Sequence, residues 1–120
     1  MKIFVLLSFL GLSFCSQAQD LKKVLLGKWK LTSLIGKQAS AFELTKRYEF
    51  TATDTAYFSN SRNRLTVKYE IDEAKQQLTL IRTGFPTAYL SVKILSPNKI
   101  ELKDLGNENS APGIIEREVE

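Results

Sequence analysis

The stretch RLTVKYEID, Arg64–Asp72, decides the fold of this chain because apolar and polar side chains alternate along all of it. Leu65, Val67, Tyr69 and Ile71 share one parity, and the residues between them are polar. Successive side chains of a β-strand point to opposite faces of the sheet. The alternation therefore predicts a strand with one buried and one solvated face.

Seven other segments show the same period less cleanly, and turn residues bound each of them. They are residues 28–35, 46–51, 55–59, 77–82, 88–95, 99–105 and 114–119. The parity of residues 55–59 is ambiguous, so either Tyr57 or Phe58 can face inward. Eight short strands predict an all-β fold, an eight-stranded antiparallel up-and-down barrel or closed sandwich, because closure removes exposed sheet edges.

A short N-terminal helix is predicted just before the first strand. Asp20 can cap this helix, its leucines share one face, and Gly27 ends it.

The connections between the predicted strands alternate in length. The tight ones are residues 52–54, 73–76 and 96–98, and the longer ones are 36–45, 60–63, 83–87 and 106–113. In a meander, alternate connections lie at opposite ends. One end is therefore expected to be closed by tight turns and the helix, and the other to carry the long loops on which function tends to depend.

Residues 1–19 are predicted to be a secretory signal peptide, followed by a single domain at 20–120. Lys2 precedes an apolar run from Ile3 to Phe14, and residues 16–18 have the small-x-small pattern of a cleavage site. The run is too short for a membrane span, so no transmembrane segment is predicted. We expect a periplasmic or secreted protein, and the brevity of the signal favours a bacterial source.

The alternative is a lipoprotein anchored through Cys15, with residues 12–15 as a lipobox. Phe14 argues against lipidation, because the residue before a lipidated cysteine is normally very small. Soluble export is favoured.

The formal net charge of +4 is spread over interleaved acids and bases. That pattern is typical of a solvated surface rather than of a nucleic-acid-binding stripe. The densest basic segment, residues 60–64, lacks interleaved aromatic residues on which bases could stack. No nucleic-acid partner is predicted.

The residue types available argue against catalysis and against metal binding. The chain contains no histidine, and its one cysteine lies in the predicted signal peptide. Ser-His-Asp and Cys-His catalysis are thereby excluded, together with nearly all zinc, copper and iron sites. Glu49, Glu70 and Glu101 alternate with apolar neighbours and are expected on the outer face. No enzyme, metal site or cofactor is predicted.

Gly27-Lys28-Trp29, within LLGKWKLTSL at 25–34, resembles the G-x-W motif of lipocalin-like proteins. With YEFTATDTAYF at 48–58, the chain is similar to small bacterial lipocalin-like domains. In that family the tryptophan closes one end of the barrel beneath a basic side chain from a late strand, and Arg117 matches that side chain. The resemblance implies structural roles for Gly27, Trp29 and Arg117, with Arg117 over the indole as a cation–π pair.

The chain departs from full-length lipocalins in being shorter and in lacking their disulfide and long C-terminal helix. Shorter strands imply a shallower cup, in which a large cavity is not expected.

Arg82 is the first candidate ligand-binding residue, because it shares a face with Leu78 and Leu80 near the long-loop end. An inward guanidinium there could hold a carboxylate or phosphate in bidentate fashion. The alternative is that Arg82 ends the strand and bends into water.

Five further residues complete the candidate site. Tyr48, Tyr69 and Ser33 have inward parity and would supply aromatic walls and hydroxyl groups, although the same residues would also suit an ordinary core. Phe42 and Phe85 lie in long loops, where they could form a lid or contact a partner protein.

Together these residues predict an exported non-enzymatic binding protein, which takes a small hydrophobic or amphipathic molecule at the loop-rich end. The ligand would be anionic if Arg82 binds it. The alternative is an interaction module at the cell envelope, with a side-chain-filled barrel. It would bind a macromolecular partner through the long loops and the tip formed by Arg62 and Arg64.

Overall fold

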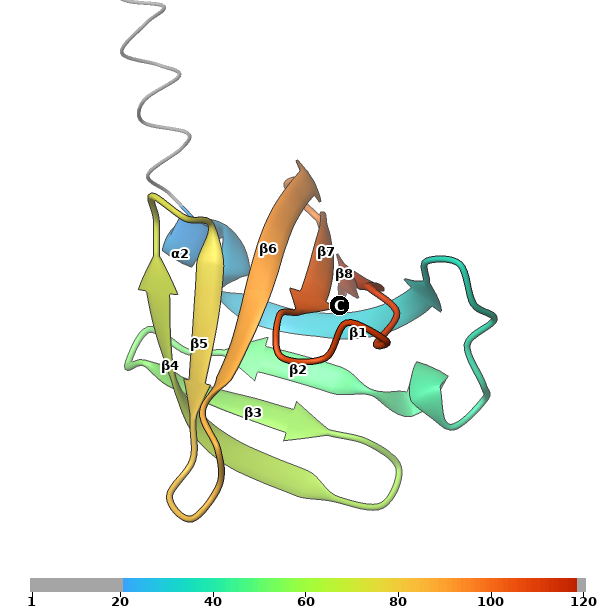
Figure 1. The fold of residues 1–120 in the computed structure, drawn as a ribbon, viewed down its shortest axis with the longest axis horizontal. Coiled ribbons are helices and arrows are strands. Elements are labelled where there is room, and N and C mark those ends of the chain that lie inside the picture. Colours follow the sequence, from blue (N-terminus) through green and yellow to red (C-terminus); the bar gives the residue numbers. More distant parts are fainter. Residues whose placement is uncertain (1–20, 119–120) are drawn as a thin grey trace, which may run out of the picture.

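The computed structural model describes residues 21–118, whose strands form a closed barrel (Figure 1). Each strand pairs antiparallel with the next, and β8 pairs with β1. The elements are α2 (Leu21–Leu25), β1 (Gly27–Leu34), the 3-10 turn η1 (Glu43–Thr45), β2 (Arg47–Phe50), β3 (Thr55–Ser59), β4 (Arg64–Asp72), β5 (Gln77–Ile81), β6 (Ala88–Ser96), β7 (Lys99–Asp104) and β8 (Gly113–Arg117). The predicted antiparallel eight-stranded fold is confirmed, and it is a barrel rather than a sandwich.

Several predictions on the N-terminal segment fall outside the described residues. They are the signal peptide at 1–19, lipidation of Cys15 and the helix cap at Asp20. Within residues 21–118, no helix combines the length and the apolar character needed to cross a membrane.

The two ends of the barrel differ as the connection lengths predict. The closed end carries α2 and the short turns 51–54, 73–76 and 97–98. Asp54 and Gln76 take positive φ values there, 63° and 52°, which tight turns require. The open end carries the long loops 35–46, 60–63, 82–87 and 105–112 (Figure 1).

Side chains at alternate strand positions fill the barrel toward its closed end. The buried cluster consists of Leu21, Leu25, Trp29, Leu31, Phe50, Ala56, Val67, Tyr69, Leu78, Val92, Ile100 and Ile115. Phe58 packs against this cluster and Tyr57 lies on the outer face, which resolves the ambiguous parity of β3. Leu65 has the parity of Val67 but is exposed, because β4 reaches the open end there.

Trp29 and Arg117 meet where β1 pairs with β8. The Trp29 side chain is fully buried, and its Nε1–H donates to the carbonyl oxygen of Leu25 at 2.8 Å. Arg117 is the cross-strand partner of Trp29, and its guanidinium carbon lies 4.3 Å from the indole centroid. The predicted contact between Arg117 and the indole is therefore present, at the closed end.

Arg117 also fixes the end of the helix. Its Nη1 donates to the carbonyl of Leu26 at 2.7 Å, and its Nη2 donates to the carbonyl of Val24 at 2.6 Å. The last carbonyl groups of any helix have no partner within the helix. Arg117 satisfies one such group, at Val24, together with the carbonyl of Leu26 just after the helix, and it holds α2 across the closed end.

Gly27 leaves the space that this arrangement needs. Its φ is +115°, and a Cβ at this position would lie 2.8 Å from Nη1 of Arg117. Glycine alone adopts that backbone conformation freely, and it has no Cβ to meet the guanidinium.

The N-terminus of α2 is held from the turn between β4 and β5. The backbone N–H groups of Leu21 and Lys22 donate to the two carboxylate oxygens of Glu73, at 3.0 and 3.3 Å. A carboxylate at this position satisfies free N–H groups and suits the positive end of the helix dipole.

The inward orientation predicted for Ser33 is wrong. The pairing of β1 with β8 shifts between Leu31, opposite Ile115, and Ser33, opposite Ile114. This bulge adds one residue to β1 and reverses the alternation after it. Leu34 consequently packs inward, and Ser33 is exposed to solvent.

Substitution of Trp29 by alanine tests how much the closed end depends on the indole. Trp29→Ala is expected to lower the free energy of unfolding by about 3–5 kcal/mol, as large-to-small changes in a core do. Urea denaturation measures the loss, and Tyr89→Ala, at an exposed aromatic residue, serves as the control. A stability close to wild type would contradict this role of Trp29.

Gly27 and Gly84 form a matched pair, because both have positive φ but nothing lies within 4 Å of a Cβ at position 84. Gly84→Ala is expected to cost about 1–2 kcal/mol from the backbone conformation alone. Gly27→Ala should cost at least about 1 kcal/mol more, since the methyl group displaces Arg117. Equal losses in thermal denaturation would show that close packing against Arg117 is unimportant.

Candidate functional site

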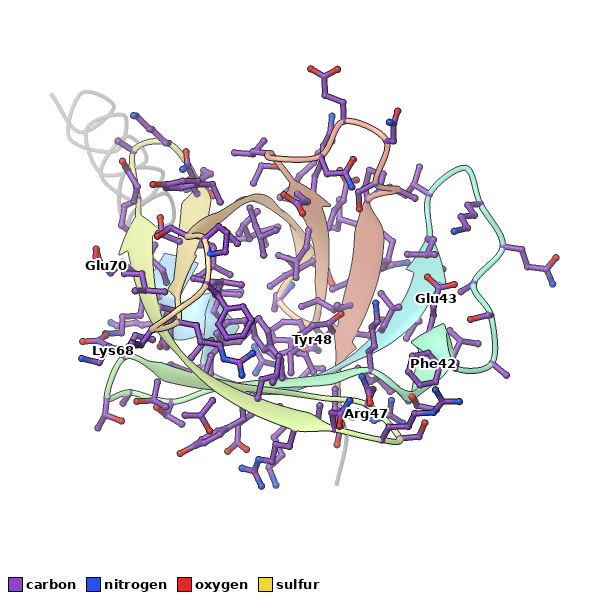
Figure 2. All side chains as sticks on the ribbon, turned by 60° about the horizontal axis from the view of Figure 1, so that its bottom comes forward. Phe42, Glu43, Arg47, Tyr48, Lys68 and Glu70 are labelled. Carbon is purple, nitrogen blue, oxygen red and sulfur yellow. The ribbon has the colours of Figure 1, made fainter. Side chains whose placement is uncertain are left out.

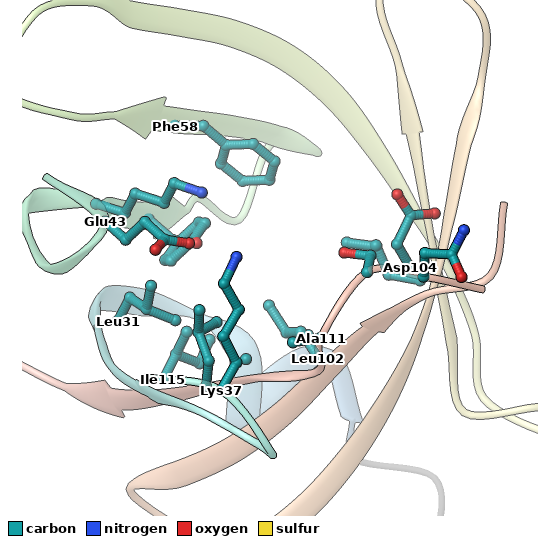
Figure 3. A pocket seen from close by; sticks show the side chains of 15 residues that line it. Leu31, Lys37, Glu43, Phe58, Leu102, Asp104, Ala111 and Ile115 are labelled. Carbon is teal, nitrogen blue, oxygen red and sulfur yellow. The ribbon is translucent and has the colours of Figure 1, made fainter. Parts of the chain in front are cut away.

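A cavity of about 330 Å³ lies at the open end, between the β1–β2 side of the barrel and β6, β7 and β8 (Figure 3). Its apolar walls come from strand positions that continue the barrel core. They are Leu31, Leu34, Phe58, Leu90, Leu102 and Ile115. The barrel is therefore filled at its closed end and hollow at its open end.

Charged side chains line the same cavity. Lys37, Glu43 and Lys46 come from the loop between β1 and β2, and Asp104 comes from the end of β7. Figure 3 shows the Lys37 side chain extending into the cavity, with Glu43 and Phe58 on one side and Asp104 on the other. Apolar walls with a few convergent charged groups are typical of small-molecule sites.

Local backbone structure brings Lys37 back over the barrel. Gly36 has a φ of +75°, and Leu34 forms an isolated antiparallel bridge with Lys37. The chain thus turns sharply after β1 instead of continuing away from the opening.

A capping box orders the next part of this loop. The backbone N–H of Ser40 donates to Oε1 of Glu43, and the backbone N–H of Glu43 donates to Oγ of Ser40, both at 3.1 Å. Lys46 is held in turn, because its carbonyl accepts a hydrogen bond from the N–H of Leu31 at 3.2 Å.

The surroundings of Glu43 keep its carboxylate charged. The hydrogen bond from the backbone of Ser40, followed by smaller contributions from the Ser40 hydroxyl and the ammonium groups of Lys37 and Lys46, lowers the pKa of Glu43. The two lysines consequently face a persistent negative charge at the cavity margin.

Tyr48 extends from β2 into the interior, whereas Lys68 and Glu70 on β4 project outward (Figure 2). The Tyr48 ring contacts the Phe58 ring edge to face, with 5.3 Å between the two ring centroids. Burial disfavours the charged phenolate and raises the pKa of Tyr48 to about 12.

Of the six predicted ligand-binding residues, only Tyr48 lines this cavity. Tyr69 is fully buried toward the closed end, where its hydroxyl donates to the carbonyl of Thr51 at 2.5 Å. Ser33 is exposed, as described above. Tyr69 and Ser33 therefore lie away from the candidate site.

Arg82 follows the end of β5, as the alternative interpretation has it, and is not among the residues that line this cavity. β5 ends at Ile81, and the Arg82 guanidinium carbon lies 4.0 Å from the ring centroid of Phe85 in the following loop. Phe42, beside Glu43 in Figure 2, has the guanidinium of Arg62 at 5.1 Å. Neither phenylalanine is among the cavity-lining residues.

Sequence reasoning missed all four charged residues of the cavity, although two of them carry a readable signal. Lys46 has the inward parity of Tyr48 and Phe50, and Asp104 has that of Ile100 and Leu102. The parity rule that selected Arg82 also selects these two. Lys37 and Glu43 belong to a loop, where strand parity gives no information.

Comparison of the chain with models of protein families and with curated proteins finds no match. The class that residues 21–118 define is a closed eight-stranded antiparallel barrel with one short helix.

The ionisation of Tyr48 gives a prediction on stability at high pH. The unfolded chain releases this proton near pH 10, while the folded barrel retains it until about pH 12. Because the unfolded state binds fewer protons in this window, the free energy of unfolding should fall by about 1.4 kcal/mol per pH unit.

Urea denaturation at several pH values measures the slope. Tyr48→Phe should reduce the slope between pH 10 and 12, whereas Tyr89→Phe, at an exposed tyrosine, should change it little. If Tyr48→Phe leaves the slope unchanged, the phenol is not shielded in the way described.

Proposed function

We propose that this protein is an exported, lipocalin-like, non-enzymatic binding protein, and that it takes a small amphipathic molecule with an anionic head group in the open-end cavity. The observation that carries this proposal is the position of Lys37 and Lys46 beside apolar walls that continue the barrel core. The apolar walls of such a cavity can contact the apolar part of an amphipathic molecule, and the two lysines can bind its anionic head group. Export rests on the pattern of residues 1–19.

The size of the cavity favours a single small ligand. At about 330 Å³, it is at the lower end of the range for small-molecule sites. Eight-stranded barrels are just wide enough to hold one such molecule. A short acyl chain or a small ring system matches these dimensions.

Two of the four charged side chains of the cavity, Lys37 and Lys46, can pair with an anion, while Glu43 and Asp104 bring the formal charge of the lining to zero. Lys37 and Lys46 share the β1–β2 side of the cavity with Glu43, which is held by Ser40. An anionic head group can join the lysines in charge-assisted hydrogen bonds, which are stronger than neutral ones. Binding rather than catalysis is proposed because the chain lacks histidine, and with it the usual general base.

Three eight-carbon molecules with different head groups separate the effect of charge from that of apolar contact. Octanoate is expected to bind about tenfold more tightly than octan-1-ol, and octylammonium should bind least. Isothermal titration calorimetry measures all three. The absence of binding by any of them would contradict the proposed ligand class.

Variants then assign the head-group preference to residues. Lys37→Gln with Lys46→Gln should remove the preference for octanoate over octan-1-ol. Lys93→Gln, on the exposed outer face of β6, is the matched control and should preserve it. Retention of the preference without both cavity lysines would place the anion elsewhere.

Glu43→Gln provides a test in the opposite direction. Glutamine can keep the capping box with Ser40, while the two lysines lose their negative neighbour. Octanoate affinity should rise by about three- to tenfold in calorimetry, and thermal stability should change little. A lower affinity would show that Glu43 is not competing with the ligand for the lysines.

A further inference from the structure

Exposed apolar side chains gather around the open end. Seven of the eight large hydrophobic residues that are exposed among residues 21–118 lie in the open-end loops or within two residues of them. They are Ile35, Phe42, Leu44, Leu65, Phe85, Tyr89 and Leu105. Leu95, near the closed end of β6, is the exception. Phe85, at the tip of its loop, is 57% exposed.

Arginines stack on the two exposed phenylalanines of the loops. The guanidinium of Arg62, from the loop between β3 and β4, lies 5.1 Å from the ring of Phe42 in the loop between β1 and β2. Arg82 lies 4.0 Å from the ring of Phe85. Each pair presents a positive charge and an apolar ring side by side.

The open-end loops also carry more basic than acidic residues. Lys37, Lys46, Arg62 and Arg82 are the bases, and Glu43 and Glu108 are the acids. A surface with this balance attracts an anionic partner, and the attraction weakens as salt concentration rises.

The apolar residues come from four separate loops around an opening, so they form a ring rather than one continuous patch. A flat, fluid surface can contact all members of such a ring at once. Phenyl rings and leucines settle at the boundary between lipid head groups and acyl chains, and basic side chains attract acidic lipids.

We infer that the open end of the barrel docks on an anionic lipid surface, with the cavity mouth facing the lipid. The loop residues Phe42, Leu44 and Phe85 enter the head-group region, while Arg62 and Arg82 pair with lipid phosphates. This docking stands independently of the ligand proposed for the cavity, because the ring of residues that makes it lies outside the cavity walls.

Flotation with lipid vesicles tests the docking on the full chain. Vesicles of phosphatidylcholine with about 30% phosphatidylglycerol should retain the protein at low salt, and pure phosphatidylcholine should retain about tenfold less. Binding should weaken severalfold in about 0.5 M salt. Equal retention by the two vesicle types would overturn the inference.

Matched variants locate the contact on the barrel. Residues 1–20 are the same in all of them, so differences in vesicle binding come from the substituted barrel residues. Arg62→Gln with Arg82→Gln should reduce binding by about fivefold for each arginine. Lys93→Gln with Lys99→Gln removes the same charge elsewhere on the barrel and should have a much smaller effect. Phe85→Ser should reduce binding by about tenfold, and Leu95→Ser should not. Equal effects of the open-end variants (Arg62→Gln with Arg82→Gln, and Phe85→Ser) and of their controls would overturn the inference.

A fluorescent reporter tests the orientation. Phe85→Trp should give blue-shifted emission that brominated phosphatidylcholine quenches in anionic vesicles, whereas Leu95→Trp should not. Quenching of the Leu95→Trp variant instead would place the opposite end of the barrel on the membrane. If Phe85→Ser abolishes binding to an envelope protein while vesicle binding persists unchanged, the ring of residues around the open end is a protein interface and the inference is wrong.

Discussion

The rest of this fold depends on the contact between Arg117 and the closed end. The Arg117 guanidinium stacks on the Trp29 indole and donates to the carbonyls of Val24 and Leu26. It fits there because Gly27 has no Cβ to clash with it. It thereby joins β8 to β1 and fixes α2 across the barrel. A closed sheet needs its first and last strands to pair, and this cluster lies at that junction.

The filled closed end explains why the hollow lies at the other end. Tight turns connect the strands near α2, and there the side chains of Trp29, Phe50 and Tyr69 fill the interior. Toward the open end, long loops replace the turns and the walls enclose a cavity of about 330 Å³. Solvent reaches this margin, so the ammonium groups of Lys37 and Lys46 lie beside apolar walls without the full cost of burying an ion.

The two proposals place different demands on the same end of the barrel. Ligand binding uses side chains that line the cavity, whereas lipid docking uses residues around it, such as Phe85 and Arg82. The protein would encounter an amphipathic ligand most often at a lipid surface, so a cavity mouth that faces lipid suits the proposed ligand. The capping box at Ser40 and Glu43 orders the loop that contributes to both.

By itself the sequence determined the strands, their antiparallel order and the assignment of long loops to one end, because alternation and turn residues act over a few positions. The Arg117–Trp29 contact was expected only from the resemblance to lipocalin-like proteins. Strand parity alone could not place residues along the barrel axis. Tyr48 and Tyr69 have the same inward parity, yet only Tyr48 lines the cavity, because Tyr48 lies at the open-end start of β2 and Tyr69 lies toward the closed-end turn after β4. The bulge in β1 turned Ser33 outward where β1 pairs with β8, a strand distant in sequence, and only the tertiary structure brought Lys37 and Asp104 to one cavity.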